Sequence, residues 1–216
     1  MSGALIIGPG PGLGQAIARR FAREGLPIAL IARKQSTVDA AAEAVAGVPV
    51  LPLTADSTDE SSLQTAIDRA TAEFGTPDAL IYNAAIIQQD SPGDLSAQQH
   101  LDAWNVNVVG AITASARVAP AMAERGSGSI ILTGGMPVPV AAYLSLSLGK
   151  AGIRALTRML HERYGPHGVH AATVTVYGGI EPGGPFDPDD IAEHYWTLHK
   201  QRRGEWQLEI AHTGEH

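Results

Sequence analysis

Cysteine is absent from this 216-residue chain, and the sequence is also poor in positive charge and in long apolar runs. Without cysteine there are no disulfides and no thiolate metal sites, so a metal would need histidine and carboxylate ligands. The eight histidines are scattered and show no H-E-x-x-H or comparable spacing. We therefore expect no metal site.

Positive charge is scarce, because lysine and arginine total 15 against 22 aspartates and glutamates, which gives a formal net charge of -7. No basic run is present that could neutralise a row of nucleic-acid phosphates. The chain also lacks the G-x-S-x-G nucleophile elbow of many hydrolases. These absences argue against a nucleic-acid partner and disfavour a hydrolase.

Residues 1–10 contain neither the charged region nor the apolar length of a signal peptide, and they lead directly into an apolar run typical of a strand. No other segment approaches the apolar length that we expect of a membrane-spanning helix. The sequence therefore predicts a soluble, cytoplasmic protein with no membrane partner.

Short apolar runs bounded by glycine, proline or aspartate alternate with longer segments of helical period, which is typical of βαβ units. The length and the 44% hydrophobic content suit one domain with one large core, spanning residues 1–216. The predicted strands are 4–7, 27–32, 48–53, 79–82, 129–133, 170–176 and 206–210. The predicted helices are 12–24, 37–46, 60–74, 97–124, 144–164 and 189–201. The alternation predicts an α/β fold with a buried parallel sheet.

A glycine-rich turn follows the first predicted strand and leads into an amphipathic helix. It contains Gly8, Gly10, Gly12, Leu13 and Gly14. Gly8 permits a sharp turn, Gly12 lets backbone approach a pyrophosphate, and Gly14 lets the helix pack closely on the sheet. The helix N-terminus adds free N–H groups and partial positive charge. This arrangement predicts a dinucleotide-binding site.

The end of the second predicted strand carries Arg33 and Lys34. An acidic residue there would bind the ribose 2′-hydroxyl of NAD, whereas arginine accommodates the 2′-phosphate of NADP. A guanidinium pairs with phosphate in a bidentate fork, and the lysine adds a second charge. We therefore expect NADP(H) in preference to NAD(H), the alternative being two solvated basic residues.

The spacing Gly8-x-x-x-Gly12-x-Gly14 resembles the T-G-x-x-x-G-x-G motif of the short-chain dehydrogenase/reductase family, with Ile7 at the position of the threonine. The resemblance extends from residue 4 to about residue 210. It implies a doubly wound Rossmann fold with a seven-stranded parallel sheet in the order 3-2-1-4-5-6-7. It also implies a homodimer or homotetramer built on the long helices around Val109 and Ile153.

Further segments resemble family motifs of the cofactor site. Asp56 and Ser57 follow the third predicted strand, where the family has an aspartate that binds the adenine amino group; a helix cap is the alternative. The turn after the fourth predicted strand resembles the family's N-N-A-G and consists of Tyr82, Asn83, Ala84 and Ala85. The second asparagine of that motif stabilises the sheet beside the cofactor, and Tyr82 replaces the first.

A glycine- and proline-rich stretch at 178–190 follows the sixth predicted strand. Gly178, Gly179 and Ile180 take the approximate place of the family segment that contacts the nicotinamide carboxamide. The loop is short and leads directly into the last predicted helix. We therefore expect an open or shallow substrate pocket.

The family's catalytic tetrad is only partly present. Asn107 resembles the tetrad asparagine, and Lys150 fits the lysine of the Y-x-x-x-K motif, which binds the nicotinamide ribose and lowers the pKa of the tyrosine. Leu146 stands where the tyrosine belongs, and leucine cannot donate or accept a proton. On spacing, the serine position falls at Thr133, which keeps a hydroxyl.

Three interpretations remain open for the missing acid/base. Tyr143, seven residues before Lys150 on the same helical face, supplies the proton; or Tyr177 does so from the end of the sixth predicted strand; or no residue does. The resemblance thus implies an NADP(H)-dependent oxidoreductase acting on a small carbonyl or alcohol. The alternative is an inactive NADP(H)-binding sensor or scaffold.

Overall fold

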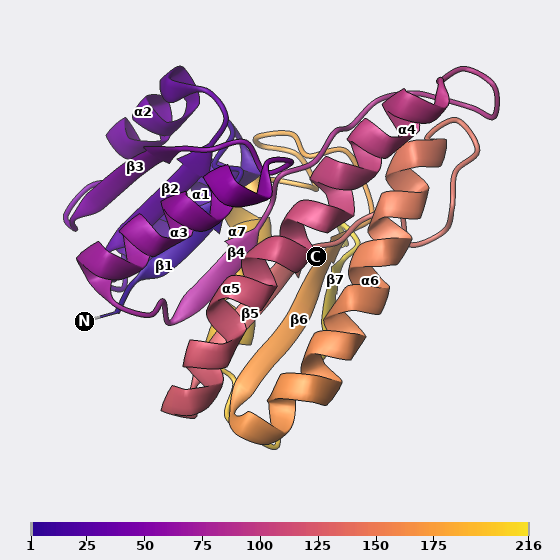
Figure 1. The fold of residues 1–216 in the computed structure, drawn as a ribbon. Helices are drawn as coiled ribbons and strands as arrows, with labels where there is room; N and C mark the ends of the chain where they lie inside the picture. The colour runs from indigo at the N-terminus through magenta and orange to yellow at the C-terminus, as the bar shows by residue number, and fades with distance from the viewer. Residues whose placement is uncertain (1, 216) are drawn as a thin grey trace.

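Seven parallel strands form one sheet in the order β3-β2-β1-β4-β5-β6-β7 in the computed structural model, which describes residues 2–215 (Figure 1). The strands are β1 (Ala4–Ile7), β2 (Ile28–Ala32), β3 (Val50–Thr54), β4 (Ala79–Tyr82), β5 (Gly128–Thr133), β6 (Val169–Val176) and β7 (Glu209–His212). The central strands are buried along their whole length, as expected for a sheet covered on both faces. The predicted doubly wound fold and its strand order are confirmed.

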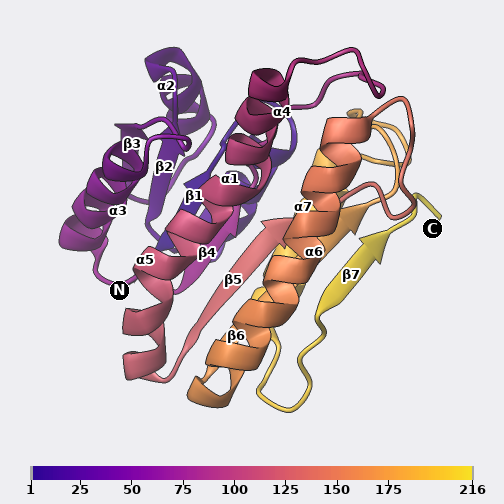
Figure 2. The same ribbon diagram turned by 45° about the vertical axis from the view of Figure 1, so that its right-hand side comes forward.

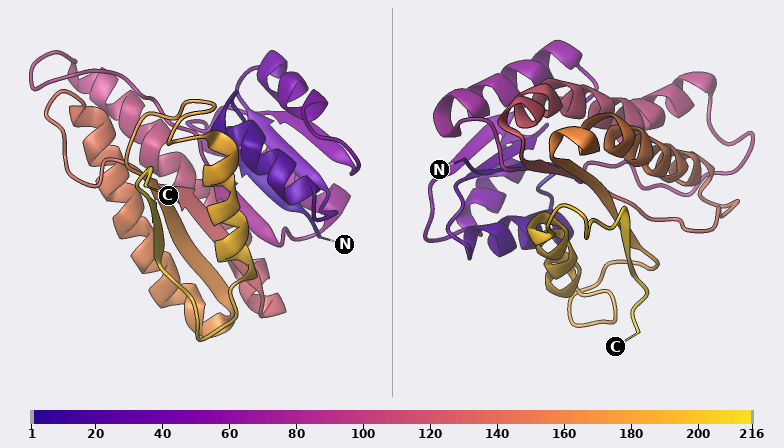
Figure 3. Two further views of the ribbon diagram at one scale, coloured as in Figure 1. Left: turned by 180° about the vertical axis from the view of Figure 1, so that it is seen from behind. Right: turned by 90° about the horizontal axis from the view of Figure 1, so that it is seen from below.

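Helices cover both faces of this sheet (Figure 3). One face packs against α1 (Leu13–Ala22), α2 (Gln35–Glu43) and α7 (Pro188–Lys200). The other packs against α3 (Glu60–Phe74), α5 (Gly110–Arg125) and α6 (Leu144–Tyr164). Since all strands are parallel, their carboxyl ends meet at one edge, where ligands bind in open α/β sheets. Figure 2 shows α5 and α6 side by side across that second face.

The helix predicted over 97–124 is present over Ala97–Arg125, and it contains a π-helical turn that was not predicted. The structure has α4 (Ala97–Trp104), a π-helical turn over Asn105–Val109, and then α5. The Tyr82 hydroxyl donates to the carbonyl of Val106 at 2.6 Å, and the amide of Asn107 bonds to the backbone of Ile86. Such π-turns are frequently found at functional sites. Here the turn lies against the segment that follows β4.

The helical segment Ala97–Arg125 has the length and the apolar composition that could cross a membrane. The expectation that no segment approaches the apolar length of a membrane-spanning helix is therefore wrong. Half of its most apolar stretch is nevertheless buried inside the fold. The core helix of a soluble protein can have the same length and apolar composition. The segment therefore gives only weak support for membrane insertion.

The last strand was predicted at 206–210 but lies at Glu209–His212. Trp206, the first residue of the predicted strand, lies outside β7. Its ring stacks on the His170 ring, with the two ring planes parallel and the ring centroids 5.0 Å apart. Its indole N–H donates to the carbonyl of Gln201. The other predicted ends differ from the observed ones by no more than three residues.

Candidate cofactor and active site

The turn between β1 and α1 is built from close backbone contacts that admit only glycine at two positions. Gly8 has φ +88°, and a Cβ atom there would lie 2.4 Å from the backbone nitrogen of Ala84. A Cβ atom on Gly14 would lie 2.4 Å from the carbonyl oxygen of Gly8. Because backbone cannot move aside cheaply, both positions hold the turn tightly against the sheet.

The start of α1 faces open space. Gly12 precedes the helix with φ +90°, no side chain caps α1, and its first turn carries no acidic residue. Cβ atoms built on Gly10 or Gly12 would meet nothing within 4 Å. The positive end of the helix dipole and its N–H groups are thus available to an anion. This is the arrangement that a pyrophosphate requires.

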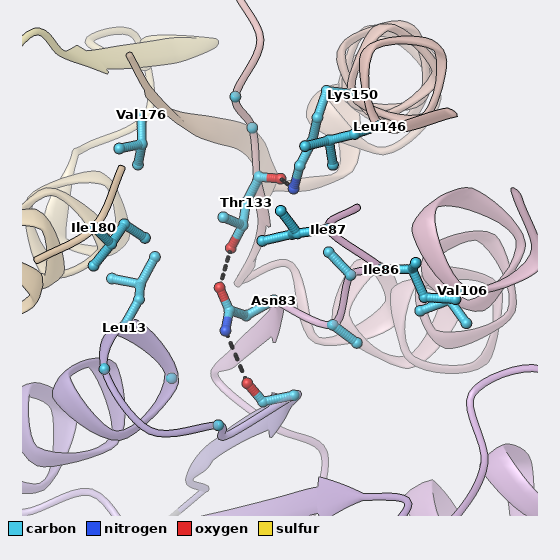
Figure 4. Close-up of a pocket in the computed structure, with 18 of the residues that line it drawn as sticks. Leu13, Asn83, Ile86, Ile87, Val106, Thr133, Leu146, Lys150, Val176 and Ile180 are labelled. Carbon is cyan, nitrogen blue, oxygen red and sulfur yellow. Dashed lines mark hydrogen bonds between the residues drawn. The ribbon is translucent and has the colours of Figure 1, made fainter. Parts of the chain in front are cut away.

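A cavity of about 1310 Å³ runs along the carboxyl ends of the strands, from this turn to α6. Most of the predicted site residues line it: Gly8, Gly10, Gly12, Leu13, Gly14, Arg33, Asp56, Ser57, Asn83, Ala84, Ala85, Thr133, Tyr143, Lys150, Gly178, Gly179 and Ile180. Figure 4 shows the central part, with Leu13 below, Lys150 and Leu146 above, and Ile180 to one side. The predicted residues Lys34 and Asn107 do not line the cavity. The fold thus brings segments from six strand ends to one site.

At one end of the cavity, Arg33 extends into solvent after β2 and Asp56 follows β3. The Asp56 carboxylate accepts bonds from the Thr58 N–H (2.9 Å) and hydroxyl (2.8 Å). The bond from the Thr58 N–H is the main cause that lowers the pKa of Asp56, and Arg33 contributes to the same effect. The Asp56 carboxylate therefore orders the turn before α3, and Asp59 caps the N-terminus of that helix. Lys34 is exposed at the start of α2.

Asn83 connects three strand ends at the centre of the site. Its amide donates to the carbonyl of Gly8 at 2.8 Å, and its oxygen accepts from the Thr133 hydroxyl at 2.9 Å (Figure 4). Its backbone N–H donates to Ile7 at 2.8 Å. Asn83 therefore fixes the ends of β1, β4 and β5 relative to one another.

The Thr133 hydroxyl is bonded within the fold. Besides Asn83 it contacts the buried Tyr195 hydroxyl of α7 at 2.7 Å. Side chains alternate along β5, and Ile131 packs on the α1–α7 face whereas Leu132 packs on the α5–α6 face. Thr133 thus points toward α7, away from the helix that carries Lys150. This geometry does not favour the predicted contact with a substrate oxygen.

Lys150 is buried beside the end of β5. Its Nζ atom donates to the carbonyl oxygen of Thr133 at 2.7 Å (Figure 4). Burial, with a smaller contribution from Arg154, lowers the pKa of Lys150 to about 8. The neighbouring Gly149 packs against Asn107, because a Cβ on Gly149 would lie 2.8 Å from that of Asn107. The π-turn asparagine therefore contacts α6 one residue before the lysine.

The position expected to hold an acid/base is apolar. Leu146 is buried next to Lys150 at the cavity wall (Figure 4). Tyr143 directly precedes α6 and lines the cavity, with its hydroxyl 3.2 Å from the amide nitrogen of Gln89. Tyr177 also lines the cavity and is 49% exposed. Two tyrosine hydroxyls are therefore available, but neither lies one turn before the lysine.

Two residues that sequence reasoning missed, Asp90 and Arg154, hold the walls of the site. The buried Asp90 carboxylate accepts from the N–H (3.0 Å) and hydroxyl (2.9 Å) of Ser145, which fixes the start of α6. Arg154 donates to the carbonyls of Gly135 (2.8 Å) and Met136 (3.2 Å). Met136 has φ +45°, an uncommon conformation for a residue with a side chain. Short loops carry no spacing signal for such contacts.

The loop after β6 is also anchored. Phe186 packs so closely on Gly178 that a Cβ there would lie 2.3 Å from its ring. His212 of β7 contacts the carbonyl of Pro185 at 2.9 Å and stands edge-on to Phe186. This side of the cavity is therefore built on a fixed support.

Comparison with known proteins agrees with this geometry. The family model described as short chain dehydrogenase matches residues 2–183. The chain is 29% identical over 181 residues to 2-dehydro-3-deoxy-D-gluconate 5-dehydrogenase of Dickeya dadantii, covering 79% of this chain and 69% of that protein. It is 31% identical over 176 residues to cis-4-hydroxycyclohexanecarboxylate dehydrogenase of Sinomonas cyclohexanicum, covering 79% and 70%.

A solved alcohol dehydrogenase of the archaeon Thermococcus sibiricus, complexed with 5-hydroxy-NADP, superimposes with a TM-score of 0.87. It is 25% identical, and the match covers 98% of this chain and 95% of that one. The glycine turn, the strand order and the position of Lys150 agree with the same assignment. The chain belongs to the short-chain dehydrogenase family of oxidoreductases.

Proposed function

We propose that this protein is an NADP(H)-dependent oxidoreductase that interconverts a small alcohol and a carbonyl compound. The observation that carries the proposal is the single cavity that contains the uncapped start of α1, Arg33 and the buried Lys150. These groups suit the pyrophosphate, the 2′-phosphate and the nicotinamide ribose of one dinucleotide. A solved relative of similar fold holds an NADP derivative.

The remaining cavity residues fit the same ligand. Asp56 and Ser57 lie at the end of the cavity that holds Arg33, where they would contact the adenosine. Gly178, Gly179 and Ile180 lie at the other end, where the backbone of this segment would contact the nicotinamide carboxamide. When bound, the nicotinamide exchanges a hydride with the substrate carbon.

We assign the proton transfer to Tyr143. Tyr143 lines the cavity directly before α6, the helix that carries Lys150, and the Gln89 amide orients its hydroxyl. Tyr177 is the alternative, but it is half exposed and lies on the opposite side, after β6. Tyr143 would protonate the carbonyl oxygen during reduction and accept the proton back during oxidation.

Binding of NADP(H) without turnover is the second candidate function. It is favoured by Leu146, which puts a hydrocarbon side chain next to Lys150, and by the Thr133 hydroxyl, which is bonded to Asn83 and Tyr195. A sensor or scaffold needs the glycine turn and Arg33 but no proton donor. The two candidates therefore differ in catalysis and not in cofactor.

We also propose a homodimer or homotetramer built on the α4–α6 side. Leu101 and Trp104 of α4 are 55% and 42% exposed, and Leu148 of α6 is 55% exposed. Exposed apolar patches of this kind are typical of protein interfaces. A monomer in light scattering at micromolar concentration would count against this.

The test replaces Tyr143 by phenylalanine, with Tyr177→Phe as the matched control. NADPH oxidation is followed with a panel of ketones and aldehydes, and NADPH affinity is measured in parallel by calorimetry. Loss of general acid catalysis should lower kcat by about 100-fold or more in Tyr143→Phe only, with unchanged NADPH affinity. Binding of NADPH without oxidation by any panel member in the unmodified protein would favour the second candidate.

A further inference from the structure

The part of the cavity beyond Lys150 has apolar walls from three separate loops. Ile87 follows β4, Val138 and Val140 follow β5, and Ile180 follows β6. Ile87 and Val138 are each 72% exposed, and Val140 and Ile180 are 44% and 41% exposed. Figure 4 shows Ile87 near Lys150, and Ile180 on the opposite side of the cavity beside Val176 and Leu13. Such exposed side chains around one hollow indicate a ligand that covers them.

Charged side chains are concentrated at the opposite end of the cavity, after β2 and β3. Among the described residues 2–215, the charged side chains that line the cavity are Arg33, Asp56 and Lys150. The first two follow β2 and β3, and the Lys150 ammonium already donates to Thr133. Arg154 is directed at the carbonyls of Gly135 and Met136 instead of the cavity. In the described part of the chain, the substrate end therefore has no free cation for a carboxylate or phosphate.

The apolar walls are held in place by contacts behind them. Arg154 bonds to the segment that leads to Val138, and Asp90 fixes the start of α6. Phe186 and His212 support the loop that carries Ile180. Since these supports are independent of any ligand, the pocket is formed in advance, and binding costs little ordering entropy.

We infer that the substrate is an uncharged carbonyl compound with an apolar chain or ring, and that acids and phosphorylated compounds are rejected. Its carbonyl lies by Tyr143, and its apolar body covers Ile87, Val138 and Ile180. This inference rests on the proposed function for the placement of the carbonyl. Each methylene that these walls cover should raise affinity about three- to four-fold.

The experiment measures binding by calorimetry, with and without NADP⁺, for 2-hexanone, 2-octanone, 2-decanone and 7-oxooctanoate. The last compound is 2-octanone with a carboxylate in place of its terminal methyl group. We expect affinity to rise along the ketone series and to fall at least ten-fold from 2-octanone to 7-oxooctanoate. Equal or tighter binding of the acid, no dependence on chain length, or no binding of any ketone would overturn the inference.

Substitutions locate the effect. Val138→Asp and Ile87→Asp change exposed side chains, so folding should be kept, and Met159→Asp on α6, 59% exposed, is the matched control outside the cavity. In Val138→Asp and Ile87→Asp, affinity should no longer rise with the chain length of the ketone. In Met159→Asp it should rise as in the unmodified protein. Chain-length-dependent binding without NADPH oxidation would contradict the proposed function alone. Preferential oxidation of NADPH by 7-oxooctanoate would contradict this inference alone.

Discussion

Replacing Leu146 by tyrosine places a side chain with a hydroxyl one helical turn before Lys150, with the two Cα atoms separated by about 6 Å along the helix axis. The position is buried and lines the cavity, so a larger ring has space to extend into it. Lys150 is already buried beside the end of β5 on the following turn of α6. The substitution therefore supplies the group that the site lacks at this position. Leu146→Phe carries the same ring without the hydroxyl and is the matched control.

The expected size of the effect follows from two contributions. Introducing a ring at a buried site costs about 1–3 kcal/mol of stability by overpacking, and both variants share this cost. A positioned general acid contributes about 10²- to 10⁴-fold in rate. The lower end applies here, because the Thr133 hydroxyl is bonded to Asn83 and Tyr195 and so provides no second hydroxyl for the substrate. We expect Leu146→Tyr to oxidise NADPH about 100-fold faster than Leu146→Phe.

The assay follows NADPH absorbance with 2-octanone as the carbonyl compound, after calorimetry has shown that both variants bind NADPH. In the Leu146→Tyr background, Tyr143→Phe should lose its effect, because the nearer hydroxyl takes over the proton transfer. Equal rates for the tyrosine and phenylalanine variants, with NADPH bound to both, would refute the reasoning that Lys150 still supports proton transfer from a hydroxyl one turn before it.

Three further predictions concern the supports of the site. Burial lowers the pKa of Lys150 to about 8 from its ordinary value of 10.5. The unfolded state therefore binds more protons between these pH values, and stability rises with pH there. From pH 7.5 to 10.5, the free energy of unfolding measured with urea should rise by about 3 kcal/mol more in the unmodified protein than in Lys150→Met. The same change in both proteins would contradict the burial of the lysine. Asp90→Ala should lower stability by about 1–3 kcal/mol, because the Ser145 N–H and hydroxyl lose their acceptor; Asp90→Asn should lose less, and equal losses would argue against a capping role. Gly14→Ala should disrupt the turn, since its Cβ would strike the Gly8 carbonyl, whereas Gly10→Ala should keep its melting temperature and bind NADPH more weakly. Retained stability in Gly14→Ala would show that the turn is looser than described.

The sheet could be predicted from the sequence because its strands are short aliphatic runs between glycine, proline and aspartate, with helical periods between them. Its last strand was placed too early because Trp206 looked like a strand residue, whereas its ring packs on His170. The π-turn over Asn105–Val109 was not predicted, because a π-turn leaves the helical period of the segments on either side almost unchanged. Local patterns therefore identify elements better than they identify irregularities within them.

The cofactor end of the site was predictable because the glycine turn and Arg33 are consecutive in sequence with the strands that carry them. The catalytic end was less so. Spacing placed a hydroxyl at Thr133, but the alternation of β5 directs it to Tyr195, a residue 62 positions later. Asp90 and Arg154 act through loops whose contacts depend on tertiary packing. Contacts of this kind are fixed only by the folded chain.

Calorimetric titration with NADPH and NADH tests the cofactor assignment most directly. A charge-assisted contact from Arg33 to the 2′-phosphate is worth about 1.5–3 kcal/mol, so NADPH should bind about 10- to 150-fold tighter than NADH. Arg33→Met should remove most of that preference and leave NADH affinity unchanged. Equal affinities for the two cofactors, or a preference that survives Arg33→Met, would contradict the account.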